Sequence, residues 1–164
     1  MIDHAMRRDA EALLAALQRA GLWVTTAESC TGGLIAAALT AIPGSSASLG
    51  EAYVTYSNAA KQRLLGVPEA LLAAHGAVSE PVALAMAAGA LERTGADLAL
   101  ACTGIAGPGG AVPGKPVGTV FIAAQRRGAQ AQVLLNHFSG DRDAVRAASV
   151  LAALRLGLAQ FPDG

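Results

Sequence analysis

The spacing of apolar residues along the chain predicts six helices. Residues 4–20 repeat alanine and leucine at helical spacing, and the glycine that follows, Gly21, is a favoured helix terminator. Residues 80–93 form a second long helix, preceded by Ser79 as its cap. The other helices are predicted at residues 31–41, 59–65, 68–74 and 141–160.

Strand-like segments alternate with these helices. Residues 22–27 and 52–56 are short apolar segments, and residues 97–102 are a continuous apolar run, as expected for a buried strand. Residues 117–125 and 130–138 are predicted to form an antiparallel pair. This order indicates an α/β fold: a single three-layer domain over residues 1–164, with a mixed β-sheet covered by helices on both faces.

Composition narrows the class of protein. The chain has 164 residues, of which 53% are hydrophobic and 4% aromatic, so one domain with small, closely packed side chains is expected. Lys and Arg number 12 and Asp and Glu number 12, so we expect no nucleic-acid partner. Glycine and proline interrupt the uncharged stretch at residues 29–50, so we expect no membrane span. Two cysteines and a polar N-terminus make the cytoplasm the simplest location.

The run AESCTGG at residues 27–33 lies where a predicted strand meets a predicted helix. Such a turn holds Ser29 at the edge of a sheet and points the free N–H groups of the next helix at a bound anion. Ser29 is therefore a candidate nucleophile, although Ser29 or Thr31 can equally serve as a helix cap. Cys30 is a rival nucleophile, but its thiolate chemistry needs an electropositive neighbour.

A second glycine-rich loop, TGIAGPGG at residues 103–110, follows the buried strand at residues 97–102. Ligands bind outside the carboxyl ends of strands in sheets of this kind, so both loops are expected to line one crevice. Their glycines let backbone N–H groups approach a phosphate or an oxyanion, although a plain tight turn explains each loop as well. Neither loop fits a Walker or dinucleotide-binding pattern.

A serine nucleophile needs a base, and Lys61 is a better candidate than the three histidines at positions 4, 75 and 137. It falls in the first turn of the predicted helix at residues 59–65, for which Asn58 is a plausible cap. The helix dipole there disfavours the charged ammonium and lowers the lysine pKa. The alternative is a solvated lysine. Tyr56 either shares the proton network or packs.

Arg142 and Arg146 stand four residues apart at the start of the last predicted helix. Two guanidinium groups on one helical face, near free backbone amides, suit a phosphate or a carboxylate. Pairing with Asp141 or Asp143 is the alternative.

Several motifs together resemble the CinA C-terminal domain family, whose enzymatic members are nicotinamide-nucleotide amidases (PncC). The resemblance covers about residues 9–160 and rests on motifs in the family's order: AESCTGG at residues 27–33, VTYSN at 54–58 with Lys61, HGAVS at 75–79, TGIAGPGG at 103–110 with KPVGT at 115–119, and FSGDR at 138–142.

The resemblance implies hydrolysis of nicotinamide mononucleotide to nicotinic acid mononucleotide and ammonia, without metal or cofactor. It implies Ser29 as nucleophile, Lys61 as its base and Tyr56 as a supporting hydroxyl. Arg142 is expected to hold the 5′-phosphate. The other expected substrate-binding residues are Thr31, Gly32, Gly33, Ser45, Ser46, Thr103 and Gly104.

Many relatives carry a large N-terminal domain with a pyrophosphatase-type activity, and a chain of this length is too short to include it. A homodimer is compatible with the resemblance, although the apolar faces can equally be buried within one subunit. A non-catalytic nucleotide-binding or regulatory module is the main alternative function. A phosphotransferase is the third, without a clear magnesium-binding carboxylate beside the glycine-rich loops.

Overall fold

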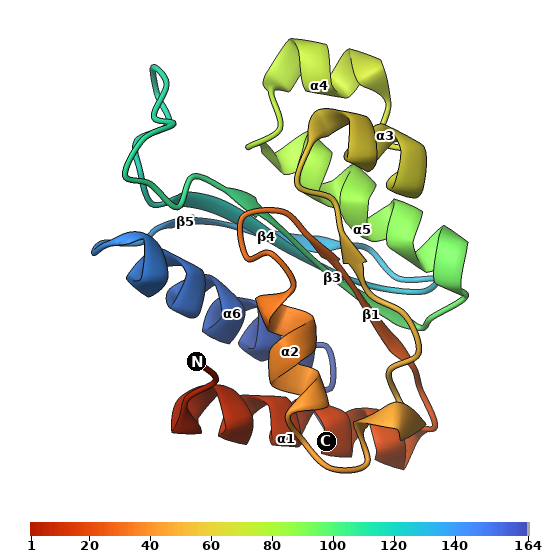
Figure 1. Ribbon diagram of the computed structural model, residues 1–164. Helices are drawn as coiled ribbons and strands as arrows, with labels where there is room; N and C mark the ends of the chain where they lie inside the picture. Colours follow the sequence, from red (N-terminus) through yellow and green to blue (C-terminus); the bar gives the residue numbers. More distant parts are fainter. Residues whose placement is uncertain (164) are drawn as a thin grey trace.

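A computed structural model describes residues 1–163 and shows one mixed sheet in the order β2-β1-β3-β4-β5 (Figure 1). The strands are β1 (Val24–Glu28), β2 (Tyr53–Val54), β3 (Leu98–Gly104), β4 (Thr119–Arg126) and β5 (Gln132–His137). Strands β2, β1 and β3 are parallel, whereas β4 and β5 are each antiparallel to the preceding strand. The predicted antiparallel pair is therefore confirmed.

Helices cover both faces of this sheet (Figure 1). One layer consists of α1 (His4–Ala20), α2 (Leu34–Thr40) and α6 (Arg142–Leu158), which pack against one another. The other consists of α5 (Glu80–Thr94) on the sheet, with α3 (Asn58–Leu65) and α4 (Glu69–His75) packed against it. The predicted three-layer α/β fold is confirmed.

Small residues bring α5 close to the sheet and α3 close to α5. The fully buried strand residues on this face are alanines, namely Ala27, Ala99, Ala101 and Ala123. Helix α5 also carries Gly89, where a Cβ would overlap the carbonyl oxygen of Leu65 on α3. The absence of that Cβ lets α3 lie directly on α5, which fixes the position of the helix that carries Lys61.

Local capping signals explain several boundaries. Asp3 accepts a hydrogen bond of 2.8 Å from the Met6 N–H, and Gly21 adopts a left-handed φ of 68°, so α1 has the predicted limits. The cap of α3 is Ser57, whose Oγ accepts from the Ala60 N–H at 3.1 Å. The prediction that Asn58 caps this helix is therefore wrong by one residue.

Helix α2 begins at Leu34, later than the predicted residue 31. Gly32 and Gly33 have φ values of 61° and 95°, in the left-handed region that a right-handed helix does not use. Residues 29–33 are therefore a turn in front of the helix. Strand β2 is also shorter than the predicted residues 52–56, since only Tyr53 and Val54 pair with β1.

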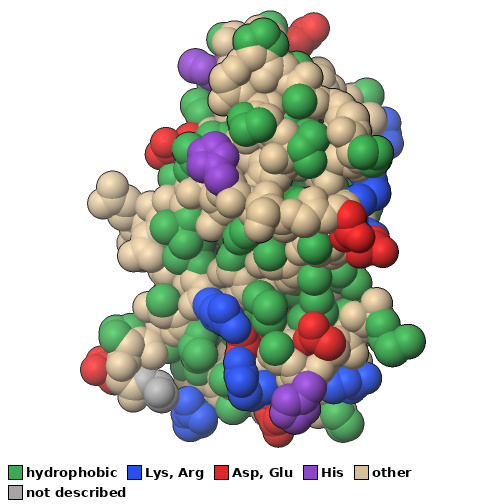
Figure 2. Space-filling view, turned by 90° about the vertical axis from the view of Figure 1, so that its left-hand side faces the viewer, with side chains coloured by type: hydrophobic (Ala, Val, Ile, Leu, Met, Phe, Trp, Pro, Cys, Tyr) green, Lys and Arg blue, Asp and Glu red, His purple; other side chains and the backbone are tan. Residues whose placement is uncertain are grey.

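No helix in residues 1–163 is long and apolar enough to cross a membrane. The face in Figure 2 carries acidic and basic side chains interspersed among hydrophobic ones, in line with the balanced composition.

Candidate active site

A pocket of about 260 Å³ opens where β1 and β3 end. Its walls come from the turn after β1, the loop after β3, and the first residues of α3 and α6. The polar side chains that line it are those of Ser29, Lys61, Tyr56, Asn58, Thr103 and Arg142. The two glycine-rich loops therefore line one crevice, as the parallel strands predicted.

Ser29 lies at the floor of this pocket, with 8% of its surface exposed. Its backbone N–H donates to the Cys102 carbonyl at 2.9 Å and extends the pairing of β1 with β3 by one residue. Its carbonyl accepts from the Gly32 N–H at 3.0 Å and closes the turn. Both bonds fix the backbone, so the hydroxyl has a defined place at the sheet edge.

The Lys61 side chain reaches Ser29 from α3. Its Nζ donates to Ser29 Oγ at 2.9 Å and to the Thr55 carbonyl at 2.7 Å. Only 1% of Lys61 is exposed. The structure thus brings together Ser29 and Lys61, which are 32 residues apart in the sequence and were predicted to act as a pair.

Burial lowers the pKa of Lys61 from its ordinary 10.5 to about 8, because a charged ammonium is poorly solvated there. A lowered pKa is what the position of Lys61 in the first turn of its helix predicts, through the helix dipole. The main cause is instead the loss of water around Nζ. A lysine with this pKa is partly neutral near physiological pH and able to accept a proton.

Cys30 borders the pocket, but its thiol is directed into the core. Its Sγ lies 3.7 Å from Cys102 Sγ, inside the hydrophobic core between the sheet and the α1, α2 and α6 layer. The bond with Cys102 lowers the pKa of the Cys30 thiol, but only 5% of the residue is exposed. The geometry therefore favours Ser29 over Cys30 as the nucleophile.

Tyr56 and Arg142 form the rim of the pocket. Arg142 donates from Nη2 to the Tyr56 hydroxyl at 2.7 Å and from Nη1 to the Gly107 carbonyl at 2.8 Å. The Tyr56 hydroxyl makes no hydrogen bond to Ser29 or Lys61, and 60% of the residue is exposed. This placement does not support the expected role of Tyr56 in the Ser29 and Lys61 proton network.

Arg146 is held elsewhere. It donates to the Thr31 carbonyl at 3.1 Å and lies 3.8 Å from Asp143, outside the pocket lining. Of the two arginines considered for an anion, only Arg142 lines the pocket.

The loop after β3 provides the opposite wall. The Thr103 hydroxyl donates to the Ala77 carbonyl at 2.9 Å, which ties β3 to the segment before α5. At Gly104 a Cβ would lie 2.6 Å from Val120 and 2.9 Å from the Thr119 carbonyl oxygen, so only glycine fits. The backbone N–H groups of Ala106 and Gly107 pair with no backbone carbonyl in residues 1–163, and both residues line the pocket.

Three expected substrate-binding residues, Thr31, Gly32 and Gly33, do not line the pocket. The Thr31 hydroxyl is fully buried and donates to Glu28 Oε2 at 2.6 Å. The Gly33 N–H donates to the same oxygen at 3.1 Å. These residues shape the turn. The amides expected to bind an anion instead donate to Glu28, a residue for which no role was predicted. The sequence does contain a signal for this role, because Glu28 is the one acidic residue among residues 22–50.

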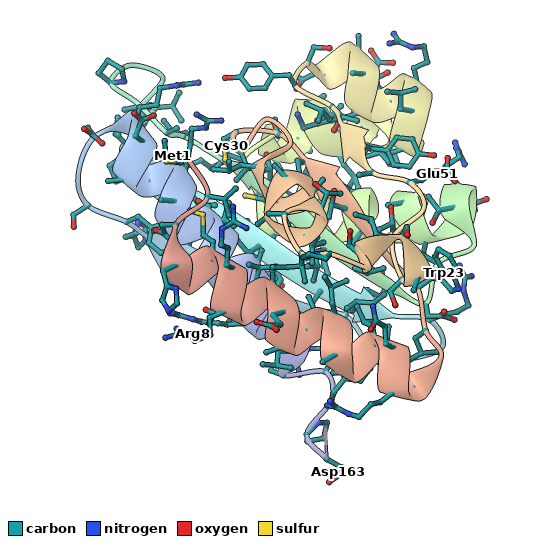
Figure 3. All side chains as sticks on the ribbon, turned by 60° about the horizontal axis from the view of Figure 1, so that its bottom comes forward. Met1, Arg8, Trp23, Cys30, Glu51 and Asp163 are labelled. Carbon is teal, nitrogen blue, oxygen red and sulfur yellow. The ribbon has the colours of Figure 1, made fainter. Side chains whose placement is uncertain are left out.

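Ser45 and Ser46 lie at the other end of the sheet, which corrects the expectation that they line the pocket. They belong to a short 3₁₀ helix, Ser45–Ala47, that leads back to the start of β1, where the Val24 N–H donates to the Ser48 carbonyl. Figure 3 shows Trp23, just before β1, far from Cys30 at the other end. The chain after α2 runs away from the site, a direction that local sequence does not reveal.

No histidine lines the pocket, and no group of three or more His, Cys, Asp or Glu side chains in residues 1–163 is placed to hold a metal ion. Asn58 lines the pocket although it was considered only as a helix cap.

Similar solved structures include the competence/damage inducible protein CihA from Agrobacterium tumefaciens, with a TM-score of 0.94 and 44% identity over 97% of both chains. A second, from Klebsiella pneumoniae, has a TM-score of 0.93 and 39% identity over 96% of this chain and 98% of that one.

Sequence relatives fall into two length classes. The chain is 55% identical to a "putative competence-damage inducible protein" from Symbiobacterium thermophilum over 85% of this chain but only 35% of the relative, so it spans about a third of such proteins. It is 51% identical to a protein from Enterobacter agglomerans named nicotinamide-nucleotide amidohydrolase PncC, over 90% of both chains. A family model described as the CinA C-terminal domain matches residues 7–160, and the chain belongs to this family.

Proposed function

We propose that this protein is a nicotinamide-nucleotide amidohydrolase that converts nicotinamide mononucleotide to nicotinic acid mononucleotide and ammonia. The observation that carries the proposal is the 2.9 Å contact of Lys61 Nζ with Ser29 Oγ at the floor of a pocket. The name of the relative from E. agglomerans, which matches over 90% of both chains, supports the choice of substrate.

In the proposed first step, neutral Lys61 takes the proton of the Ser29 hydroxyl. The serine oxygen attacks the carboxamide carbon of the nicotinamide ring. The Thr55 carbonyl, 2.7 Å from Nζ, orients the amine and stabilises the ammonium that forms. Because Lys61 is buried, its charged form returns the proton readily.

The developing oxyanion needs donors near Ser29. The backbone N–H of Cys30 follows the nucleophile and pairs with no backbone carbonyl in residues 1–163, so it is free for this role. The unpaired N–H groups of Ala106 and Gly107, on the loop after β3, provide a second set of donors from the opposite wall. The N-terminus of α2 does not contribute, because Glu28 accepts its N–H groups.

Collapse of this intermediate breaks the carbon–nitrogen bond, and the Lys61 ammonium protonates the leaving amine to give ammonia. A water molecule then attacks the acyl-enzyme with neutral Lys61 as its base. The products are the carboxylic acid and free Ser29, so each turnover consumes one amide and one water.

Arg142 is proposed to bind the 5′-phosphate, and Arg142→Ala is expected to raise KM about tenfold or more with little change in kcat. The guanidinium has five N–H donors, and its hydrogen bonds to Tyr56 and Gly107 leave donors free for phosphate. Steady-state kinetics of ammonia release measure both constants. Arg146→Ala, outside the pocket, serves as the control, and an unchanged KM in Arg142→Ala would remove Arg142 from the phosphate site.

The proposed function is tested by ammonia release from nicotinamide mononucleotide, with and without a chelator. We expect stoichiometric ammonia and nicotinic acid mononucleotide, unaffected by the chelator. Stabilisation against heat by the nucleotide without any ammonia release would instead favour a non-catalytic nucleotide-binding module.

A further inference from the structure

Glu28, the last residue of β1, is a buried carboxylate that the proposed mechanism does not use. Its side chain has no exposed surface, and it directly precedes Ser29. A buried carboxylate is costly unless hydrogen bonds replace its water. A buried Glu28 carboxylate therefore needs hydrogen-bond donors around it.

The two oxygens of Glu28 accept five hydrogen bonds, all from the turn and its two flanks. The donors are the hydroxyls of Thr26 and Thr31 and the backbone N–H groups of Gly33, Ile35 and Ala36. The shortest, from Thr31, is 2.6 Å, and those from the backbone are 2.9 to 3.1 Å. The carboxylate thus caps α2 and ties it to β1.

This arrangement clamps both ends of the turn that carries Ser29. The turn contains Gly32 and Gly33, which have more backbone freedom than any other residue type. One end is fixed because Glu28 belongs to the sheet, and the other because Thr31 and Gly33 donate to its carboxylate. Without the carboxylate, α2 and the turn lose their direct side-chain link to β1.

We propose that Glu28 is a positioning residue: its carboxylate holds the turn so that Ser29 Oγ stays within reach of Lys61 Nζ. The proposal rests on the Ser/Lys mechanism above. Glu28 acts through geometry, since a displacement of about 1 Å in a reacting group costs on the order of 10²-fold in rate. The hydrogen bonds of Lys61 Nζ go to Ser29 and Thr55 and not to Glu28, so Glu28 acts on the serine side of the pair.

Glu28→Gln is the first test. The amide keeps the shape of the side chain, but its NH₂ group faces N–H and O–H donors in place of an acceptor oxygen. We expect kcat to fall at least about tenfold, KM to stay within about twofold, and the pH at which the rate is half-maximal to remain that of the wild type.

Thr31 provides a milder pair of variants in case Glu28→Gln folds poorly. Thr31→Val removes the 2.6 Å bond to Glu28 but keeps the size of a fully buried side chain, whereas Thr31→Ser keeps the hydroxyl. We expect kcat to fall in Thr31→Val and to be largely retained in Thr31→Ser. Asp3→Ala, which removes the cap of α1 and lies outside the pocket lining, is expected to lower the melting temperature without lowering kcat.

Labelling of Ser29 by a fluorophosphonate probe separates this inference from the choice of substrate. The wild type is expected to label at Ser29, and Glu28→Gln to label at least about tenfold more slowly when both are folded. Slower labelling supports the clamp even if nicotinamide mononucleotide is not the substrate. Equal labelling rates and equal kcat in the wild type and Glu28→Gln would overturn it.

Discussion

Ser29→Ala is expected to lower ammonia release from nicotinamide mononucleotide by at least about 10³-fold, because no other side chain at Lys61 Nζ can form the acyl-enzyme. The loss should appear in kcat, since the pocket walls and Arg142 remain. The fold should be retained, as the serine backbone makes the bonds that hold the turn. Circular dichroism and the melting temperature check this point.

Cys30→Ala is the matched control for that experiment. It alters the neighbouring side chain, which faces Cys102 in the core, and leaves the serine hydroxyl in place. We expect turnover close to that of the wild type. Near-normal turnover in Ser29→Ala together with loss in Cys30→Ala would reverse the assignment and make the thiol the nucleophile.

Lys61→Met is expected to lower kcat/KM by roughly 10²- to 10⁴-fold, the usual contribution of a general base. Methionine fills most of the same buried space without an amine, so the lost property is proton transfer. Lys61→Arg tests the same point from the other side, because an arginine stays protonated and cannot act as a base. An active Lys61→Arg enzyme would show that Lys61 acts only through its charge.

The pH dependence of the wild type follows from the lowered pKa of Lys61. The neutral amine is the active form, so the rate should rise with pH and level off above a midpoint near the pKa of about 8. At pH 7 about a tenth of the lysine is neutral. A rate that does not change between about pH 6 and 9 would contradict the role of Lys61 as base.

Local sequence was sufficient for most of the secondary structure. Helix α1 has the predicted limits because Asp3 and Gly21, its two caps, are residues with strong terminal preferences. The start of α2 was misplaced because the apolar spacing continues through residues that two left-handed glycines exclude from the helix. Strand β2 was overestimated because pairing with β1, and not β propensity, sets its length.

The site shows the same division at the level of single residues. Ser29 and Lys61 were identified from the strand-to-helix run, the start of a short helix and the family motifs, all of which are features of the sequence. Tyr56 was expected beside them, but its hydroxyl contacts Arg142, because the direction of a rim side chain depends on what the last helix places opposite it. Ser45 and Ser46 were expected in the pocket, yet the chain after α2 runs away from the pocket and places them near the start of β1.

The sequence by itself therefore determined the family and the α/β class, and it singled out the two residues proposed to react, because each depends on residue type and short-range order. The tertiary structure decided what depends on contacts between distant segments. It buried Lys61 beside Ser29, which is the physical cause of the lowered pKa, and it turned the amides at the start of α2 toward Glu28 and not toward the pocket. Burial and hydrogen-bond partners are properties of the packed chain, so no local pattern could have supplied them.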